Sequence, residues 1–228
     1  MKKLSIIILS LLLVLIVGQA AFAKNSISLN AGYAAEIYVG STRLNSGINL
    51  GLSGNYYFTN NFSLSGGASA SIFWYEGYTA VDLGINLFAK YDILKASLSN
   101  NIFNLGAQAG IVYATAFTNA TSASLPNILF LAAGVYVDAY VTPKLNVFFD
   151  SKFPLGFFFF ESGASDSFFF KKFFYDLKVG ATYSVSPKIN VGLEFGISNT
   201  NFSGAWNFLM SSYNSLILTA GAKVVYLF

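Results

Sequence analysis

The sequence contains no cysteine and no histidine. The absence of cysteine excludes a disulfide framework and thiolate metal sites. The absence of histidine removes the side chain that most often serves as a general base or activates a nucleophile. Because metal, nucleotide and haem motifs are also absent from the sequence, we expect no cofactor and no catalytic residue, and we do not expect an enzyme.

Charged residues are also scarce, at 10% of 228 residues, whereas apolar residues reach 54% and aromatic residues 18%. Ordinary soluble domains have roughly 25% charged residues. The formal net charge of +3 includes Lys2 and Lys3, so a chain without these two lysines carries about +1. This composition argues against nucleic acid as a partner and favours contact with lipid.

Residues 1–23 have the organisation of a secretory signal peptide. Lys2 and Lys3 provide the positive start, residues 4–17 form the apolar core, and Ala21-Phe22-Ala23 is a small-x-small cleavage site. An uncleaved membrane anchor is the alternative, because residues 4–23 are nearly long enough to span a bilayer. We expect cleavage after Ala23, which leaves residues 24–228 as one domain.

Apolar and polar residues alternate along most of residues 24–228. From Ile27 to Ile37 the odd positions are apolar, while the even positions are mainly Ser, Asn, Gly and Glu. Residues 189–198 repeat the pattern. Such period-two alternation predicts strands, and small polar residues on one face are typical of a crowded barrel lumen rather than of a soluble sandwich.

Turn signals divide this region into ten predicted strands. Their ranges are 26–39, 47–58, 62–74, 79–91, 102–116, 128–141, 145–157, 171–184, 189–198 and 214–228. Tight connections at 59–61, 142–144 and 186–188 alternate with longer ones at 117–127, 158–170 and 199–213, as in barrels with short turns on one side of a membrane. Residues 92–101 leave the count open, because Leu94, Ala96 and Leu98 could extend a strand; eight strands are the alternative.

The last predicted strand ends its apolar parity on Tyr226 and Phe228. A C-terminal aromatic residue on an apolar face is similar to the assembly signal of outer-membrane barrels. Together with the leader and the alternation, it makes residues 24–228 resemble the small bacterial outer-membrane β-barrel class, which includes OmpA-, OmpX- and OmpW-like proteins. The resemblance implies an all-β, transmembrane, antiparallel up-and-down β-barrel in the outer membrane. Its expected partners are outer-membrane lipid and the barrel assembly machinery, and a monomer is expected.

The polar parity of the predicted strands collects ten charged residues. They are Glu36, Asp82, Lys90, Asp138, Asp150, Lys152, Asp176, Lys178, Glu194 and Lys223. We expect all of them in the lumen, because a Lys at the lipid midplane costs about 2–4 kcal/mol. Glu194 and Lys223 fall at similar heights on neighbouring strands, which predicts a paired network. This network either fills the lumen structurally or lines a constricted ion pathway.

Residues 157–174 contain two runs of phenylalanine around a short Ser- and Gly-containing segment. The candidate interaction residues are Phe158, Phe160, Phe168 and Phe170. One interpretation is an aromatic girdle at the membrane interface. The other is an exposed apolar surface that docks a surface partner or admits a hydrophobic solute.

The sequence therefore predicts an integral outer-membrane barrel with a mostly occluded, charge-paired lumen. We expect a structural or surface-interaction role through its extracellular loops. The alternative is a small porin-like channel or a hydrophobic-solute transporter.

Overall fold

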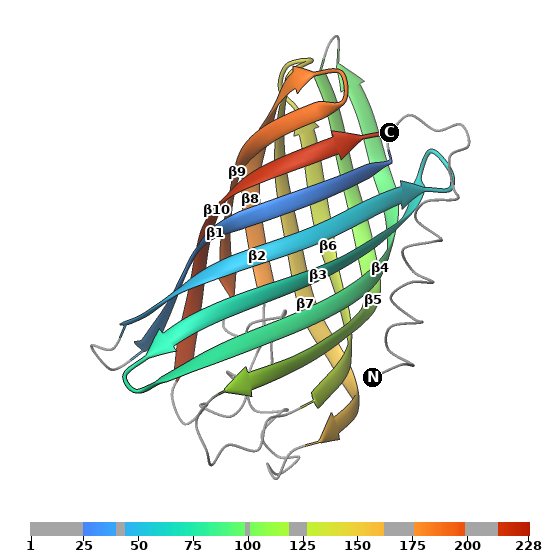
Figure 1. The fold of residues 1–228 in the computed structure, drawn as a ribbon. Coiled ribbons are helices and arrows are strands. Elements are labelled where there is room, and N and C mark those ends of the chain that lie inside the picture. Colours follow the sequence, from blue (N-terminus) through green and yellow to red (C-terminus); the bar gives the residue numbers. More distant parts are fainter. Residues whose placement is uncertain (1–24, 40–43, 99–100, 119–126, 162–175, 199–213) are drawn as a thin grey trace.

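The computed structural model describes residues 25–39, 44–98, 101–118, 127–161, 176–198 and 214–228. These residues form ten antiparallel strands in a closed barrel, in the spatial order β1-β10-β9-β8-β7-β6-β5-β4-β3-β2 (Figure 1). The strands are β1 (Ser26–Val39), β2 (Leu44–Tyr57), β3 (Phe62–Tyr75), β4 (Tyr78–Leu98), β5 (Asn101–Thr118), β6 (Asn127–Tyr140), β7 (Leu145–Glu161), β8 (Asp176–Ser186), β9 (Ile189–Ser198) and β10 (Asn214–Leu227). The predicted up-and-down barrel is confirmed, with ten strands rather than eight.

The largest departure from the predicted ranges is in β4, which runs to Leu98 instead of ending at residue 91. The ladder with β5 shifts between Asp92 and Leu94, so Ile93 is an extra residue in a β-bulge. Ile93 and Leu94 are consequently both exposed, at 64% and 50%. Leu94, Ala96 and Leu98 do extend the strand, but the connection to β5 moves to residues 99–100 and the strand count stays at ten.

Smaller differences occur at other strand ends. β2 begins at Leu44 instead of residue 47, because its pairing with β1 continues to Ile37. β7 continues to Glu161, and β8 ends at Ser186 because its ladder with β9 shifts between Ser184 and Ser186. The described part of β8 begins at Asp176; residues 171–175 of the predicted strand lie outside the described residues. No described segment is a helix long and apolar enough to cross a membrane.

The three tight turns share one hydroxyl-based hydrogen-bond pattern. Thr59 Oγ1 accepts from the backbone N–H groups of Asn61 and Phe62, at 3.2 and 3.0 Å. The hydroxyls of Thr142 and Ser186 likewise accept from the backbone N–H groups of the residues two and three positions later in the chain. This chemistry explains why short polar segments suffice to reverse the chain there. The β8–β9 turn lies at the top of Figure 1, opposite the β3–β4 hairpin.

These turns define the two ends of the barrel. The turn end carries residues 58–61, 141–144 and 187–188, and Phe228 is held there by a 3.0 Å hydrogen bond from its N–H to the carbonyl of Asn25. The loop end carries the β3–β4 hairpin, in which Gly77 has a φ of 88°. We call the corresponding parts of the interior the turn half and the loop half.

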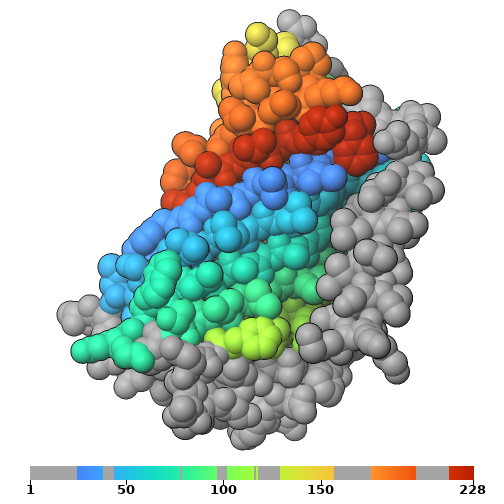
Figure 2. Space-filling model, viewed as in Figure 1, coloured from blue at the N-terminus to red at the C-terminus, as the bar shows by residue number. Residues whose placement is uncertain are grey.

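Large apolar side chains cover the outside of the barrel. Figure 2 shows the outer face of β10, β1, β2 and β3 as adjoining bands. Water contact would be unfavourable for so much apolar surface, whereas a lipid environment accommodates it. The exposed residues include Leu29, Leu50, Leu52, Ile85, Ile111, Val135, Val179, Leu193, Phe195 and Val224.

Candidate functional site in the barrel lumen

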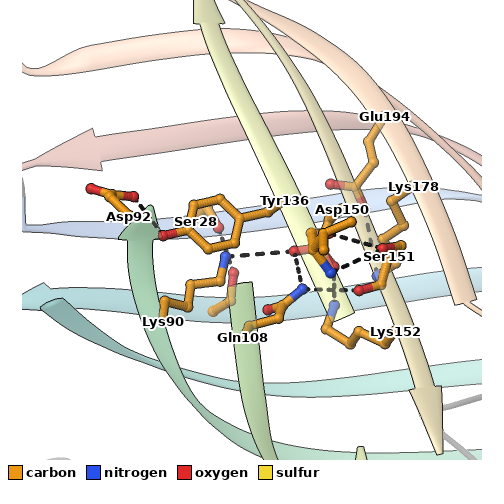
Figure 3. A network of polar contacts seen from close by, with 12 residues as sticks. Ser28, Lys90, Asp92, Gln108, Tyr136, Asp150, Ser151, Lys152, Lys178 and Glu194 are labelled. Atoms are coloured by element: carbon orange, nitrogen blue, oxygen red, sulfur yellow. Dashed lines mark hydrogen bonds and ion pairs between the residues drawn. The ribbon is translucent and has the colours of Figure 1, made fainter. Parts of the chain in front are cut away.

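The inner face of the barrel carries the polar parity of the strands. Asp150 on β7 is the centre of one group of contacts (Figure 3). Its carboxylate forms ion pairs with Lys152 and with Lys90 on β4, the latter at 3.5 Å. Gln108 on β5 donates from Nε2 to Asp150 at 3.0 Å and to the carbonyl of Ser151 at 3.1 Å. The group therefore links three strands across the lumen.

Glu194 on β9 is the centre of a second group. Lys223 on β10 lies 2.9 Å from its carboxylate and Lys178 on β8 lies 3.8 Å from it. Asn30 on β1 donates to the same carboxylate at 3.3 Å. Lys178 is also the register partner of Asp150, so the two groups meet at the β7–β8 ladder.

Aromatic rings extend these groups. The Nζ atom of Lys90 lies 4.5 Å from the centre of the Tyr136 ring, and that of Lys223 lies 4.3 Å from the Phe148 ring. The Tyr136 hydroxyl donates to Asp92 at 2.5 Å, and Asp92 pairs with Lys95 at 2.7 Å. Polar contacts therefore continue from the middle of the lumen to the bulge in β4.

Ser151 adds an irregular element to this wall. Its Oγ accepts from the N–H of Val135 at 3.1 Å and donates to the carbonyl of the same residue at 2.9 Å. The β6–β7 ladder has no paired residues between Ala133 and Tyr136, although its register is the same on both sides, and this side chain contacts the backbone there. The Ser151 hydroxyl thus satisfies the N–H and the carbonyl of Val135.

The loop half of the lumen has a different composition. Phe73 on β3 contacts Ala34 on β1 and Ile217 on β10 in a buried cluster, with Tyr75 packed against it. Further buried apolar side chains on β5 and β6 are Val112, Ala114, Phe130 and Ala132, and Phe88 on β4 lies at the border with the turn half, where it also lines the cavity. The Nζ atom of Lys152 lies 5.5 Å from the Phe88 ring, so the apolar side chains adjoin the charged groups.

Three of the predicted charged residues are buried in the loop half. Glu36 accepts hydrogen bonds from Asn45 Nδ2 at 3.1 Å and from the Tyr75 hydroxyl at 2.9 Å. Asp82 lies on β4 near the loop end, and Asp176 opens β8 opposite Lys152. Glu36 and Asp82 are therefore separated along the barrel from the groups around Asp150 and Glu194, whereas Asp176 adjoins the first group as the register partner of Lys152.

A cavity of about 430 Å³ occupies the turn half. One side is formed by Lys90, Lys152, Lys178 and Lys223 with Asp138, Asp150 and Glu194. The other side is formed by small polar residues of β1, β2 and β3. They include Ser26, Ser28, Ser53, Asn55, Ser65, Gly67 and Ser69. The strand-end residues Tyr57, Tyr140 and Leu227 also line it, so the cavity reaches the turn end.

The structure thus distributes the ten predicted lumen residues over four places. Lys90, Asp150 and Lys152 form one group, and Lys178, Glu194 and Lys223 form the other. Asp138 lines the cavity close to the turn end, whereas Glu36, Asp82 and Asp176 lie in the loop half. Among the described residues, no group of three or more potential ligand side chains could hold a metal ion.

The other predicted residues are on the outside or beyond the described part. The Tyr226 and Phe228 rings stack, with centroids 6.4 Å apart. Phe158 and Phe160 lie within the backbone range of β7, and nothing is described of their side chains. Phe168, Phe170 and the predicted signal peptide lie outside the described residues.

Sequence reasoning missed several residues of the two charged groups. Asn30, Gln108 and Tyr136 share the inward parity of their strands, and that parity could have identified them. Asp92 continues the inward parity of Asp82 and Lys90, and it was missed because the predicted strand ended at residue 91. Ser151 carried no such signal, since its contact depends on an interruption of the ladder.

No protein-family model and no curated protein sequence matches this chain. Among solved structures, Neisserial surface protein A is 14% identical, with a TM-score of 0.47 over 90% of this chain and 97% of that chain. The attachment invasion locus protein Ail of Yersinia pestis is 11% identical, with a TM-score of 0.41 over 91% of this chain and 100% of that chain. The outer membrane protein OprG from Pseudomonas aeruginosa is 12% identical, with a TM-score of 0.41 over 91% of this chain and 98% of that chain. These TM-scores are below 0.5, so the architecture rests on the strand pairing of this chain.

Proposed function

We propose that this protein is an integral outer-membrane barrel that is closed in its loop half and has a structural or surface-interaction role through its loops. The observation that carries the proposal is the set of buried apolar side chains inside that half. Phe73 and Phe130 lie in that half and Phe88 lies at its border with the cavity; the three come from different strands and are each 3% exposed or less. Packed aromatic side chains inside a narrow barrel exclude water and hydrated solutes.

Energetic considerations support closure as the resting state. Moving Phe73 aside would separate it from Ala34 and Ile217 and would expose apolar surface to the lumen. The adjoining carboxylate of Glu36 is held by two hydrogen bonds and would have to move as well. The apolar cluster around Phe73 and the hydrogen-bonded Glu36 therefore both obstruct a hydrated ion in the loop half.

The proposed setting is the outer membrane, with lipid around the apolar outer face and insertion by the barrel assembly machinery. The proposal includes a monomer and assigns no catalytic role, because the sequence has no histidine and no cysteine. The predicted surface partner of the Phe-rich segment belongs to the same proposal. Its residues 162–175 are outside the described structure.

A small channel is the second candidate. The observation in its favour is the cavity of about 430 Å³, which provides a polar space through the turn half. A solute path would require an opening through the loop-half side chains. Hydrophobic-solute transport would instead involve the Phe-rich segment.

Conductance in planar lipid bilayers tests the proposal directly. We expect no current above background for the wild type and a measurable current for Phe73→Ser combined with Phe88→Ser, because these changes remove one ring from the closed half and one from its border with the cavity. Phe58→Ser is the matched control, since Phe58 is an exposed turn residue outside the lumen. Steady conductance of the wild type, equal to that of the double variant, would contradict closure and favour the channel.

Localisation tests the premise that both candidates share. We expect the protein in the outer-membrane fraction, with gel migration that changes on heating as the barrel unfolds. A chain that fractionates as a soluble periplasmic protein would rule out both candidates.

A further inference from the structure

The charges of the lumen are unevenly distributed along its length. Three carboxylates, those of Glu36, Asp82 and Asp176, are buried in the loop half. The turn-half cavity is lined by four lysines and three carboxylates, a formal excess of one positive charge. The residues that line the cavity at the turn end therefore carry one excess positive charge, and Asp176 adjoins Lys152 and Lys178 without lining the cavity.

Two carboxylates are each shared by two of these lysines. Asp150 forms ion pairs with Lys90 and Lys152, and Glu194 forms ion pairs with Lys178 and Lys223. An ammonium group has three N–H donors, and sharing one carboxylate between two ammonium groups leaves donors for another acceptor. The longest of these ion pairs, 3.8 Å, belongs to Lys178, which also interacts with the carboxylate of Asp176 two residues away.

The lysines are also accessible from the cavity. Their side chains retain between 15% and 36% of their surface, with Lys178 the most accessible. The cavity wall formed by β1, β2 and β3 provides mainly serine hydroxyls and asparagine amides, with Tyr57 at the turn end. A volume of about 430 Å³ is within the range of small-molecule sites, which is roughly 300–1,000 Å³.

We infer that this cavity binds a small hydrophilic anion, a carboxylate or a phosphate, that enters from the turn end. The ammonium groups of Lys178 and Lys223 hold its charged oxygens, while the serine-rich wall hydrogen-bonds its remaining polar atoms. Barrel walls of low dielectric constant strengthen the attraction inside the lumen. The inference goes beyond the proposed function, because it needs neither conduction nor the loops.

Calorimetric titration of the folded, detergent-solubilised protein tests the inference. Inorganic phosphate and acetate are the two anion probes, and tetramethylammonium chloride at equal ionic strength is the cation probe. We expect saturable binding of phosphate, acetate or both, and none of tetramethylammonium. Which anion binds distinguishes phosphate from carboxylate recognition.

Variants locate the binding within the cavity. Lys178→Gln and Lys223→Gln should each weaken anion binding by about tenfold or more. Lys188→Gln is the matched control, because Lys188 is an exposed lysine on the β8–β9 turn outside the cavity lining. Ser69→Asp is a second test that leaves every ion pair intact and should weaken binding by placing a negative charge on the opposite wall.

Three results would overturn the inference. They are no saturable anion binding by the folded wild type, equal loss of binding in Lys188→Gln and Lys178→Gln, and unchanged binding in Ser69→Asp. Heat-dependent gel migration verifies folding of each variant, and Ser69→Asp decides the matter if the lysine variants do not fold. Because binding is measured without a membrane current, its failure is separate from failure of the proposed closure.

Discussion

Tyr136 on β6 and Asp92 on β4 are joined by a 2.5 Å hydrogen bond that passes over the intervening strand β5. The crossing occurs at Gly106, where a Cβ atom would lie 2.3 Å from Cζ of Tyr136. Phe148 crosses β8 at Gly180 in the same way, with its Cζ 2.5 Å from such a Cβ position. Because glycine has no side chain, it leaves space for a long side chain of the neighbouring strand to cross over it inside the lumen.

Gly106→Ala should destabilise the barrel by about 1–3 kcal/mol, because the new methyl group displaces Tyr136 and weakens its bond to Asp92. Urea unfolding in lipid vesicles measures the effect. Gly156→Ala on β7 is the matched control, since no atom lies within 4 Å of its Cβ position. Equal stability of the two variants would contradict the importance of this crossing.

Asp150→Asn should lower the free energy of unfolding by about 1–3 kcal/mol, because Lys90 and Lys152 lose the carboxylate that they share. Lys152→Met made in the Asp150→Asn background should cost less than it does alone. The double-mutant cycle measures this difference as a coupling energy, expected at about 0.5–3 kcal/mol. Strict additivity of the two changes would show that the pair contributes nothing.

Leu50→Arg should cost about 2–4 kcal/mol in lipid vesicles, because Leu50 faces outward near the middle of β2. Ser69→Arg on the neighbouring strand should cost less than half as much, since its side chain enters the turn-half cavity. Unfolding titrations of both variants in the same lipid provide the comparison. A larger penalty for Ser69→Arg would contradict the assignment of the two faces.

Phe228→Ala should reduce the fraction of protein that reaches the folded, heat-modifiable form, because the residue ends the apolar parity of β10 and stacks on Tyr226. Phe58→Ala removes an aromatic residue from the same end of the barrel and should leave assembly unchanged. Pulse-labelled cells sampled over time give the folding yield. An equal yield for wild type and Phe228→Ala would exclude the assembly role.

Much of the architecture follows from the energetic cost of placing charge in lipid. The alternation in β1 and β9 assigned every outward residue there, because one face must be apolar. Counting along neighbouring strands was sufficient to place Glu194 beside Lys223, which lie 2.9 Å apart. Side-chain positions in regular ladders can be predicted from the sequence because the period of the strand is fixed.

Side-chain positions at irregular parts of a ladder cannot be predicted in this way. The bulge at Ile93 decided where β4 ends, yet residues 92–101 fit a turn and a longer strand equally well. Parity also assigns a side chain to the lumen without showing which side chains meet across it. The separation of Glu36 and Asp82 from the lysines therefore emerged only from the tilt and register of the assembled strands.

The seam between β1 and β10 has a consequence for biogenesis. It pairs Ser26 with Leu227 and continues through fourteen residue pairs to Val39 and Asn214, joining segments that lie roughly 200 residues apart in the chain. Until β10 is in place, β1 is paired only with β2 and its other edge is open. A chain that lacks β10 would leave the backbone donors and acceptors on one edge of β1 unpaired, so we expect the barrel to be prone to aggregation until β10 has paired with β1.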